Sequence, residues 1–129
     1  MAIRIVRLGG PRIHDEGLRL GTVRRPPRGV PKAEYGRRNY YDVWLPTLAP
    51  SLELLTRGKN LSTEPTAWRA FARAFKKEMS APAPSRELDL LAALSHRTNL
   101  SVGCYCEDES RCHRSILRQL LKERGATFA

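Results

Sequence analysis

The sequence predicts a single α/β domain, in which a small and mostly parallel sheet is flanked by helices. Short apolar runs typical of strands occur at residues 3–8 and 100–104, and segments with helical periodicity lie between and after them. Strands that alternate with helices favour parallel pairing, because each connection returns the chain to the same end of the sheet. The 129 residues suffice for one hydrophobic core, so we expect one domain over residues 1–129.

Two strands and a long loop are predicted in the N-terminal third. Residues 3–8 have the sequence IRIVRL and precede a Gly-Gly-Pro turn. A second strand is expected within residues 18–25, around the run LGTV. Paired prolines and a glycine exclude a regular helix from residues 24–41, which we expect to form a basic loop. Residues 40–45 are expected to be a short extended segment that ends at Pro46.

Three helices are expected in the middle of the chain. The first begins after Ser51, a predicted N-cap, and ends at Gly58. The second spans about residues 66–79 and has an apolar stripe at helical spacing, which we expect to pack in the core. That stripe consists of Trp68, Phe71, Phe75 and Met79. The third is expected to begin at Ser85, because the two prolines before it should break the chain.

A cluster of cysteine and histidine lies where the last predicted strand, residues 100–104, leads through a polar turn into the final helix, about residues 111–124. The cluster consists of Cys104, Cys106, Cys112 and His113. The carboxyl end of a parallel strand that faces a helix N-terminus is the usual place of a site in α/β proteins. We therefore expect the chemistry of this protein at that junction.

Three interpretations of this cluster are open. In the first, Cys112 is a reactive thiol whose pKa is lowered by the helix N-terminus and by neighbouring arginines, and His113 is its acid–base partner. In the second, the three cysteines and His113 bind zinc, although a C-x-C pair replaces the usual C-x₂-C spacing. In the third, Cys104 is a small buried hydrophobic residue, and Cys106 and Cys112 are ordinary neighbours.

The final helix also has a basic stripe, which we interpret as its solvated face. The stripe consists of Arg111, Arg114, Arg118 and Lys122. His113 falls on the opposite side of the helix, with the apolar residues, so we expect its ring to point inward.

The predicted basic loop combines arginines with aromatic residues. Arginine forks bind phosphates and aromatic faces stack on bases, so this composition favours a nucleotide or nucleic-acid surface. The candidate anion-binding residues are Arg24, Arg25, Arg28 and Arg114. In the alternative interpretation, Tyr41 and Trp44 pack the loop onto the core and the arginines are simply solvated.

Composition and charge narrow the class of protein. The formal net charge is +10, and residues 1–38 hold ten Lys and Arg against three Asp and Glu, a local balance of +7. Such a surface attracts polyanions. The chain shows no signal-peptide pattern and no apolar stretch that could span a bilayer, which predicts a cytoplasmic protein with no membrane partner. Three clustered cysteines in that reducing compartment favour metal, redox or catalytic chemistry over a structural disulfide.

Two stretches of the sequence resemble the YeaO-like proteins of the domain of unknown function 488 (DUF488) family. Residues 44–51, WLPTLAPS, resemble the WL…LAPS segment of that family, and residues 112–115, CHRS, preceded by a C-x-C pair, resemble its C…CHR signature. The resemblance covers nearly the whole chain. It implies an α/β domain without an established activity, and the residues it marks are Arg24, Arg25, Cys112, His113 and Arg114.

These observations favour a domain that binds a phosphate-bearing ligand, a nucleotide or a nucleic acid, between the basic loop and the cysteine junction. Cys112 would be nucleophile or redox centre, with Cys106 beside it and His113 as its acid–base partner. Two alternatives are a non-enzymatic nucleic-acid-binding module and a small structural zinc domain. The sequence indicates no cofactor other than that zinc.

Overall fold

A four-stranded sheet organises the protein. The computed structural model describes residues 1–58 and 65–129. The strands are β1 (Ile3–Arg7), β2 (Leu18–Gly21), β3 (Val43–Trp44) and β4 (Leu100–Cys104). Their spatial order is β1-β4-β2-β3, and every pairing between them is parallel. The α/β fold class is therefore confirmed. All the described strands end at one edge of the sheet, where ligand sites of such folds lie.

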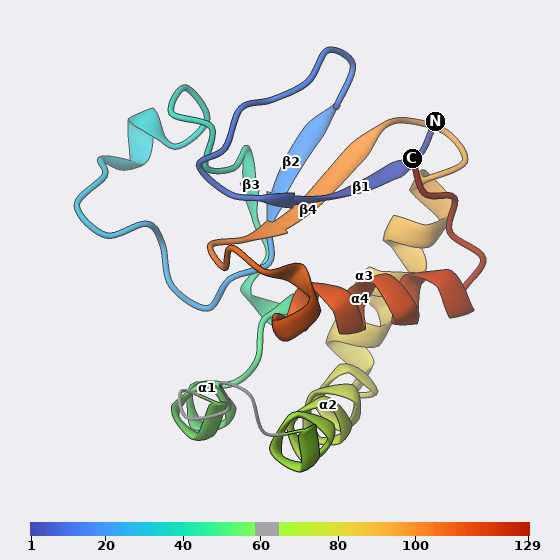
Figure 1. Ribbon diagram of the computed structural model, residues 1–129. Helices are drawn as coiled ribbons and strands as arrows, with labels where there is room; N and C mark the ends of the chain where they lie inside the picture. Colours follow the sequence, from blue (N-terminus) through green and yellow to red (C-terminus); the bar gives the residue numbers. More distant parts are fainter. Residues whose placement is uncertain (59–64) are drawn as a thin grey trace.

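The described helices are α1 (Leu52–Gly58), α2 (Pro65–Met79), α3 (Pro82–Leu94) and α4 (His113–Glu123). They lie below the sheet in the view of Figure 1, with α4 nearest to the strands and α1 farther away, beside α2. Strand β4 is buried along its whole length between β1 and β2. Its residues Leu100 and Val102 point into the main core, where they meet the apolar faces of α2, α3 and α4. Within the described residues, no helix has the length and apolar character needed to span a bilayer.

The predicted helix starts are partly right. Ser51 Oγ accepts a hydrogen bond from the backbone N–H of Leu54 at 3.2 Å, which confirms it as the N-cap of α1. The stripe on α2 is confirmed as core, with Phe71, Phe75 and Met79 buried. The start of α3 was predicted wrongly, because the helix begins at Pro82 rather than at Ser85. A proline fits the first turn of a helix, where its missing N–H has no intrahelical acceptor.

Strands β2 and β3 are shorter than the extended segments expected from the sequence. Strand β2 ends at Gly21, after which Thr22 donates through its backbone N–H and its hydroxyl to the carbonyl oxygen of Gly103. These bonds turn the chain into the basic loop. Strand β3 contains only Val43 and Trp44 and forms an edge of the sheet.

A buried ion pair supports the face of the sheet that points away from the core. Arg19 and Ser101 are neighbours in register on β2 and β4, so both side chains point to this face. Arg19, 1% exposed, bonds both carboxylate oxygens of Glu16 at 2.8 and 2.9 Å. The same guanidinium donates to the carbonyl oxygens of Gly10, Pro11 and Asn39, and so fixes the loops that cover this face.

This ion pair predicts acid sensitivity. Burial by itself raises the pKa of Glu16, but the hydrogen bonds from Arg19 and Ser101 outweigh it and lower that pKa from 4.5 to about 2. A carboxyl group with a lowered folded-state pKa stabilises the fold above its unfolded pKa and loses that contribution as the pH falls. The free energy of unfolding should therefore drop by about 3 kcal/mol between pH 5 and pH 2 through this group alone.

Urea unfolding across that pH range checks this prediction. The Glu16→Gln variant should be less stable at neutral pH and should show a shallower decline toward pH 2. Equal pH dependence in the variant and the parent would contradict it. Replacement of the exposed Glu123 by Gln is the matched control and should leave the profile unchanged.

Candidate functional site

The cysteine sulfurs meet at the carboxyl edge of the sheet. Cys104 is the last residue of β4, Cys112 is the N-cap of α4, and Cys106 lies in the turn between them. The three Sγ atoms all lie within 4.8 Å of one another. Sγ of Cys104 lies 3.8 Å from Sγ of Cys106. The strand, the turn and the helix thus supply one sulfur each to a single cluster, which we call the thiol site.

The three sulfurs differ in their access to solvent. Cys104 and Cys112 are buried, and Cys112 is only 2% exposed, whereas Cys106 is exposed. Cys104 and Cys112 pack in a small apolar cluster with Leu8, Val23 and Tyr41. A reagent or substrate therefore reaches Cys106 first. The sequence placed the reacting sulfur at Cys112, and the structure makes Cys106 the accessible one.

His113 points inward, as the helical periodicity predicted. Its Nε2 lies 2.6 Å from the carbonyl oxygen of Thr22, and its ring packs edge-on against Phe75. A carbonyl oxygen only accepts hydrogen bonds, so Nε2 carries the proton and Nδ1 of the neutral ring is an acceptor. Nδ1 lies 3.6 Å from Sγ of Cys112 and can accept its S–H proton. The ring of His113 therefore links Thr22 and Cys112 through its two nitrogens.

Arg114 is buried, which corrects the interpretation of the basic stripe on the final helix as a solvated face. The residue is 3% exposed, and its guanidinium donates to the carbonyl oxygens of Val6 and Cys106, both at 2.6 Å. These carbonyls at the sheet edge draw the side chain inward. Its Nε has no partner among the described residues. Arg118 fits the stripe better, since it is partly exposed and pairs with Glu109.

The electrostatics lower the pKa of the exposed Cys106 and of the buried Cys112, and raise that of Cys104. The pKa of Cys106 is lowered, first by the S–H of Cys104 and then by that of Cys112, and the charge of Arg114 adds to the effect. The pKa of Cys104 is raised, because its proton is held between two sulfurs and its site is buried. The pKa of Cys112 is lowered by the S–H of Cys104, and His113 contributes further. Of the two thiols with a lowered pKa, only Cys106 is exposed.

The same sulfurs fit a metal such as zinc. Zinc–thiolate bonds of about 2.3 Å in a tetrahedron separate the sulfurs by about 3.8 Å. The Cys104–Cys106 distance has that value, and the third sulfur lies close enough to complete a three-cysteine set. His113, which the sequence proposed as a fourth ligand, is not part of this close set; its Nδ1 faces Sγ of Cys112, and its Nε2 is hydrogen-bonded to Thr22.

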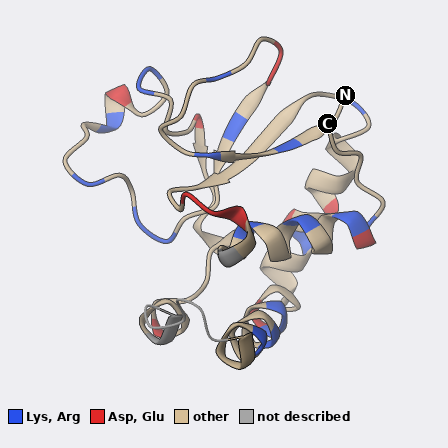
Figure 2. Ribbon diagram, viewed as in Figure 1, with Lys and Arg blue, Asp and Glu red and all other residues tan. Residues whose placement is uncertain are grey.

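The basic loop runs beside the thiol site, and Figure 2 shows the basic residues distributed along it. The hydroxyl of Tyr105, which lies between the first two cysteines, donates to the carbonyl oxygen of Arg25 at 3.0 Å. The side chains of Arg25 and Arg28 are exposed. Arg24 instead donates to the carbonyl oxygens of Ala49 and Pro50 and holds the loop against the chain that enters α1.

Residues 3–125 match the family model DUF488-N3a, described as the active DUF488-N3 subclade. The chain belongs to the DUF488 family. The resemblance seen in the sequence is thereby confirmed. Searches of the curated proteins and of the solved structures found no match.

Two parts of this DUF488 site gave no signal in the sequence. The backbone oxygen of Thr22 sets the tautomer of His113, and a contact from a backbone atom cannot be predicted from the type of residue at that position. Tyr105 joins the cysteine turn to the loop, and its position between two cysteines was visible but its partner was not. Both contacts join segments that are about 80 or more residues apart.

The lowered pKa of Cys106 in this DUF488 domain predicts unusual reactivity. A thiol with the ordinary pKa of about 9 is only about 0.1% thiolate at pH 6. Cys106 should remain largely ionised there and should react with iodoacetamide at nearly the same rate at pH 6 and pH 8. Mass spectrometry of peptides from the folded protein should locate the label at Cys106.

The Cys106→Ser variant should lose this fast labelling, whereas the buried Cys104 and Cys112 should react slowly in both proteins. A rate that rises tenfold per pH unit between pH 6 and pH 8 would show an unperturbed thiol and contradict the prediction.

Proposed function

We propose that this protein is a thiol-dependent enzyme that acts on a phosphate-bearing ligand, a nucleotide or a nucleic acid, and that Sγ of Cys106 is its reacting atom. The observation that carries the proposal is the asymmetry of the thiol site, in which one exposed sulfur is supported by two buried ones. The description of the matched subclade as active also favours an enzyme over a purely structural domain.

The geometry of the thiol site supports a nucleophilic role for Cys106. Its Sγ accepts from the S–H of Cys104, and its carbonyl oxygen is held by Arg114, so the sulfur is fixed at the sheet edge. In the proposed step, this thiolate gives an electron pair to an electrophilic atom of the substrate. The displaced group leaves with the pair of the bond that breaks. The buried Cys112 and His113 share a proton between Sγ and Nδ1, close to the reacting sulfur.

Exposed cations close to Cys106 support an anionic substrate. Arg7 donates through Nε to the carbonyl oxygen of Tyr105 at 3.2 Å and lies 3.5 Å from Glu107, with both side chains largely exposed. Arg25 is joined to the same tyrosine through its backbone, and its guanidinium pairs with none of the described residues. The local excess of positive charge over residues 1–38 adds long-range attraction for phosphate.

Binding of a fluorescein-labelled single-stranded oligonucleotide at low salt tests the ligand class. The Arg25→Ala/Arg28→Ala double variant should bind more weakly, and the slope of log affinity against log salt should fall by about 1 for each arginine removed. The Arg73→Ala/Arg97→Ala variant removes equal charge at exposed positions on α2 and after α3, and should bind like the parent.

Absence of binding at low salt would contradict the proposed ligand class. The same experiment also tests whether the protein is a non-enzymatic nucleic-acid-binding module. In that case Cys106→Ser would still bind the oligonucleotide, and Cys106 of the parent protein would be no more reactive than a free thiol.

A structural zinc site is the second candidate, favoured by the sulfur spacing of the three cysteines. It predicts close to one equivalent of zinc in freshly purified, tag-free protein, and a loss of that metal in Cys106→Ser. Bound zinc would also protect all three thiols from iodoacetamide until a chelator is added. Metal analysis that finds less than about a tenth of an equivalent would exclude this candidate.

A further inference from the structure

A hollow of about 490 Å³ opens beside β3, on the side of the basic loop. Its walls come from the short 3-10 turn Lys32–Glu34, from the chain just after it, and from the edge strand itself. The volume lies within the range of pockets that hold small molecules and cofactors. None of the three cysteines lines this hollow, so it is separate from the thiol site.

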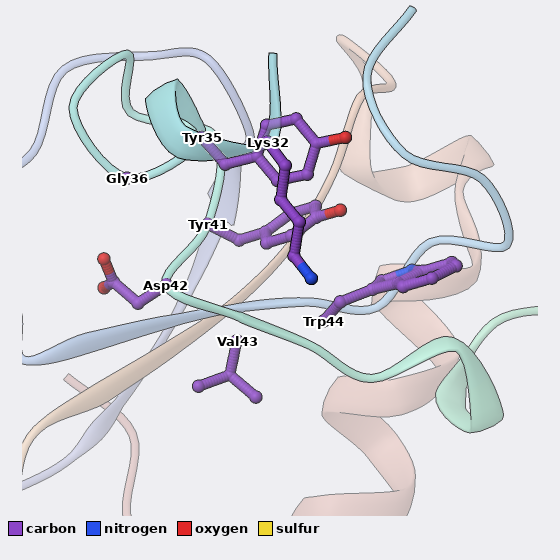
Figure 3. Close-up of a pocket in the computed structure, with 7 residues that line it drawn as sticks. All are labelled: Lys32, Tyr35, Gly36, Tyr41, Asp42, Val43 and Trp44. Carbon is purple, nitrogen blue, oxygen red and sulfur yellow. The ribbon is translucent and has the colours of Figure 1, made fainter. Parts of the chain in front are cut away.

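Aromatic rings form much of the wall, and two contacts fix them in place. The indole N–H of Trp44 donates to the carbonyl oxygen of Val23 at 2.7 Å, and the residue is 40% exposed at the sheet edge. The rings of Tyr35 and Tyr41 meet edge to face, with centroids 5.2 Å apart. Figure 3 shows these rings around one space, with Val43 at its border. The rings are therefore preorganised flat surfaces on which a planar ligand can stack.

One polar group in the wall has no partner. Tyr41 is 4% exposed, and its hydroxyl makes no hydrogen bond with any described residue. Figure 3 shows that hydroxyl on the side of the hollow where Lys32 and Trp44 also lie. Burial raises the pKa of Tyr41 to about 12, so the hydroxyl stays protonated at neutral pH and can donate as well as accept. A buried hydroxyl without a partner is uncommon in folded proteins and points to a ligand atom.

The charges around the hollow favour an anion. Lys32 is exposed and forms an ion pair with none of the described residues, and its ammonium group extends between Tyr41 and Trp44 (Figure 3). Asp42, the acid in the wall, is already neutralised, because Arg12 donates to both of its oxygens at 2.9 and 3.0 Å. The net character of the hollow is therefore aromatic and positive.

We propose that this hollow binds the base of a nucleotide. Trp44 and Tyr35 stack on the base, the hydroxyl of Tyr41 bonds to its edge, and Lys32 contacts the phosphate. The proposal rests on the proposed function, since it names the part of a phosphate-bearing ligand that the basic loop recognises. Tyr41 connects the two places, because its ring packs in the same buried cluster as Cys104 and Cys112.

Calorimetric titration with the 5′ monophosphates of adenosine, guanosine, cytidine and uridine tests the proposal, with ribose 5-phosphate as the ligand that lacks a base. At least one nucleotide should bind about tenfold more tightly than ribose 5-phosphate, as stacking on one base provides. Trp44→Leu should remove that difference, and Trp44→Phe should keep most of it. Trp68→Phe, which changes a tryptophan stacked on Phe71 in α2, is the matched control and should leave binding unchanged.

Tyr41→Phe separates a ligand role from a structural one. The variant removes a hydroxyl that has no partner in the free protein, so it should be at least as stable as the parent to thermal unfolding. It should nevertheless bind the nucleotide several-fold more weakly. Unchanged nucleotide affinity in this variant would remove the hydroxyl from the proposed contacts.

The hollow is not a base site if ribose 5-phosphate binds as tightly as every nucleotide, if no nucleotide binds, or if Trp44→Leu keeps the full nucleotide affinity. A failure of the proposed function would give different results. Cys106 would then show no fast alkylation, or the oligonucleotide would bind equally well after removal of Arg25 and Arg28, and either result is independent of the nucleotide affinity of Trp44→Leu.

Discussion

The guanidinium of Arg114 joins the end of β1 to the turn that carries Cys106. It does so with two short hydrogen bonds, to the carbonyl oxygens of Val6 and Cys106. Val6 lies near the end of β1, in register with Gly103 of β4, and Cys106 lies in the turn that follows β4. A charged donor on the first turn of α4 satisfies both at once and fixes that helix against the sheet edge. The same contact anchors the turn that carries Cys106, whose Sγ lies 3.8 Å from that of Cys104.

The two candidate sites share one wall. Tyr41 packs with Cys104 and Cys112 in the smaller buried cluster and also lines the hollow beside β3. Its ring lies so close to Gly21 that a Cβ at that position would come within 2.3 Å of it. The last residue of β2 therefore has to be glycine for the ring to reach this place. Loop, sheet edge and thiol site are thus parts of one packed unit rather than independent surfaces.

Opposite faces of the sheet have different physical roles. The face toward the helices is apolar and supplies the core, with Leu100 and Val102 at its centre. The other face is covered by loops, which are held by the buried pair of Glu16 and Arg19 and, near Gly21 and Gly103, by the apolar packing of Tyr41 and Leu8. Asp42 extends the same arrangement, since it accepts from the backbone of Arg19 and from the side chain of Arg12. A buried ionic network of this kind specifies loop positions, and those loops lead directly to the hollow and the thiol site.

The sequence by itself determined most of the secondary structure and the place of the cysteine cluster. Apolar periodicity located β1, β4, α2 and α4, because the 2.0 and 3.6 residue repeats follow from backbone geometry alone. The spacing of the cysteines around a strand end located the thiol site. Only the tertiary structure decided which sulfur is exposed, that Arg114 is buried, and that Tyr41 keeps an unpaired hydroxyl. Those properties depend on contacts between segments far apart in the chain, such as Val6 with Arg114 and Thr22 with His113, which no local pattern encodes.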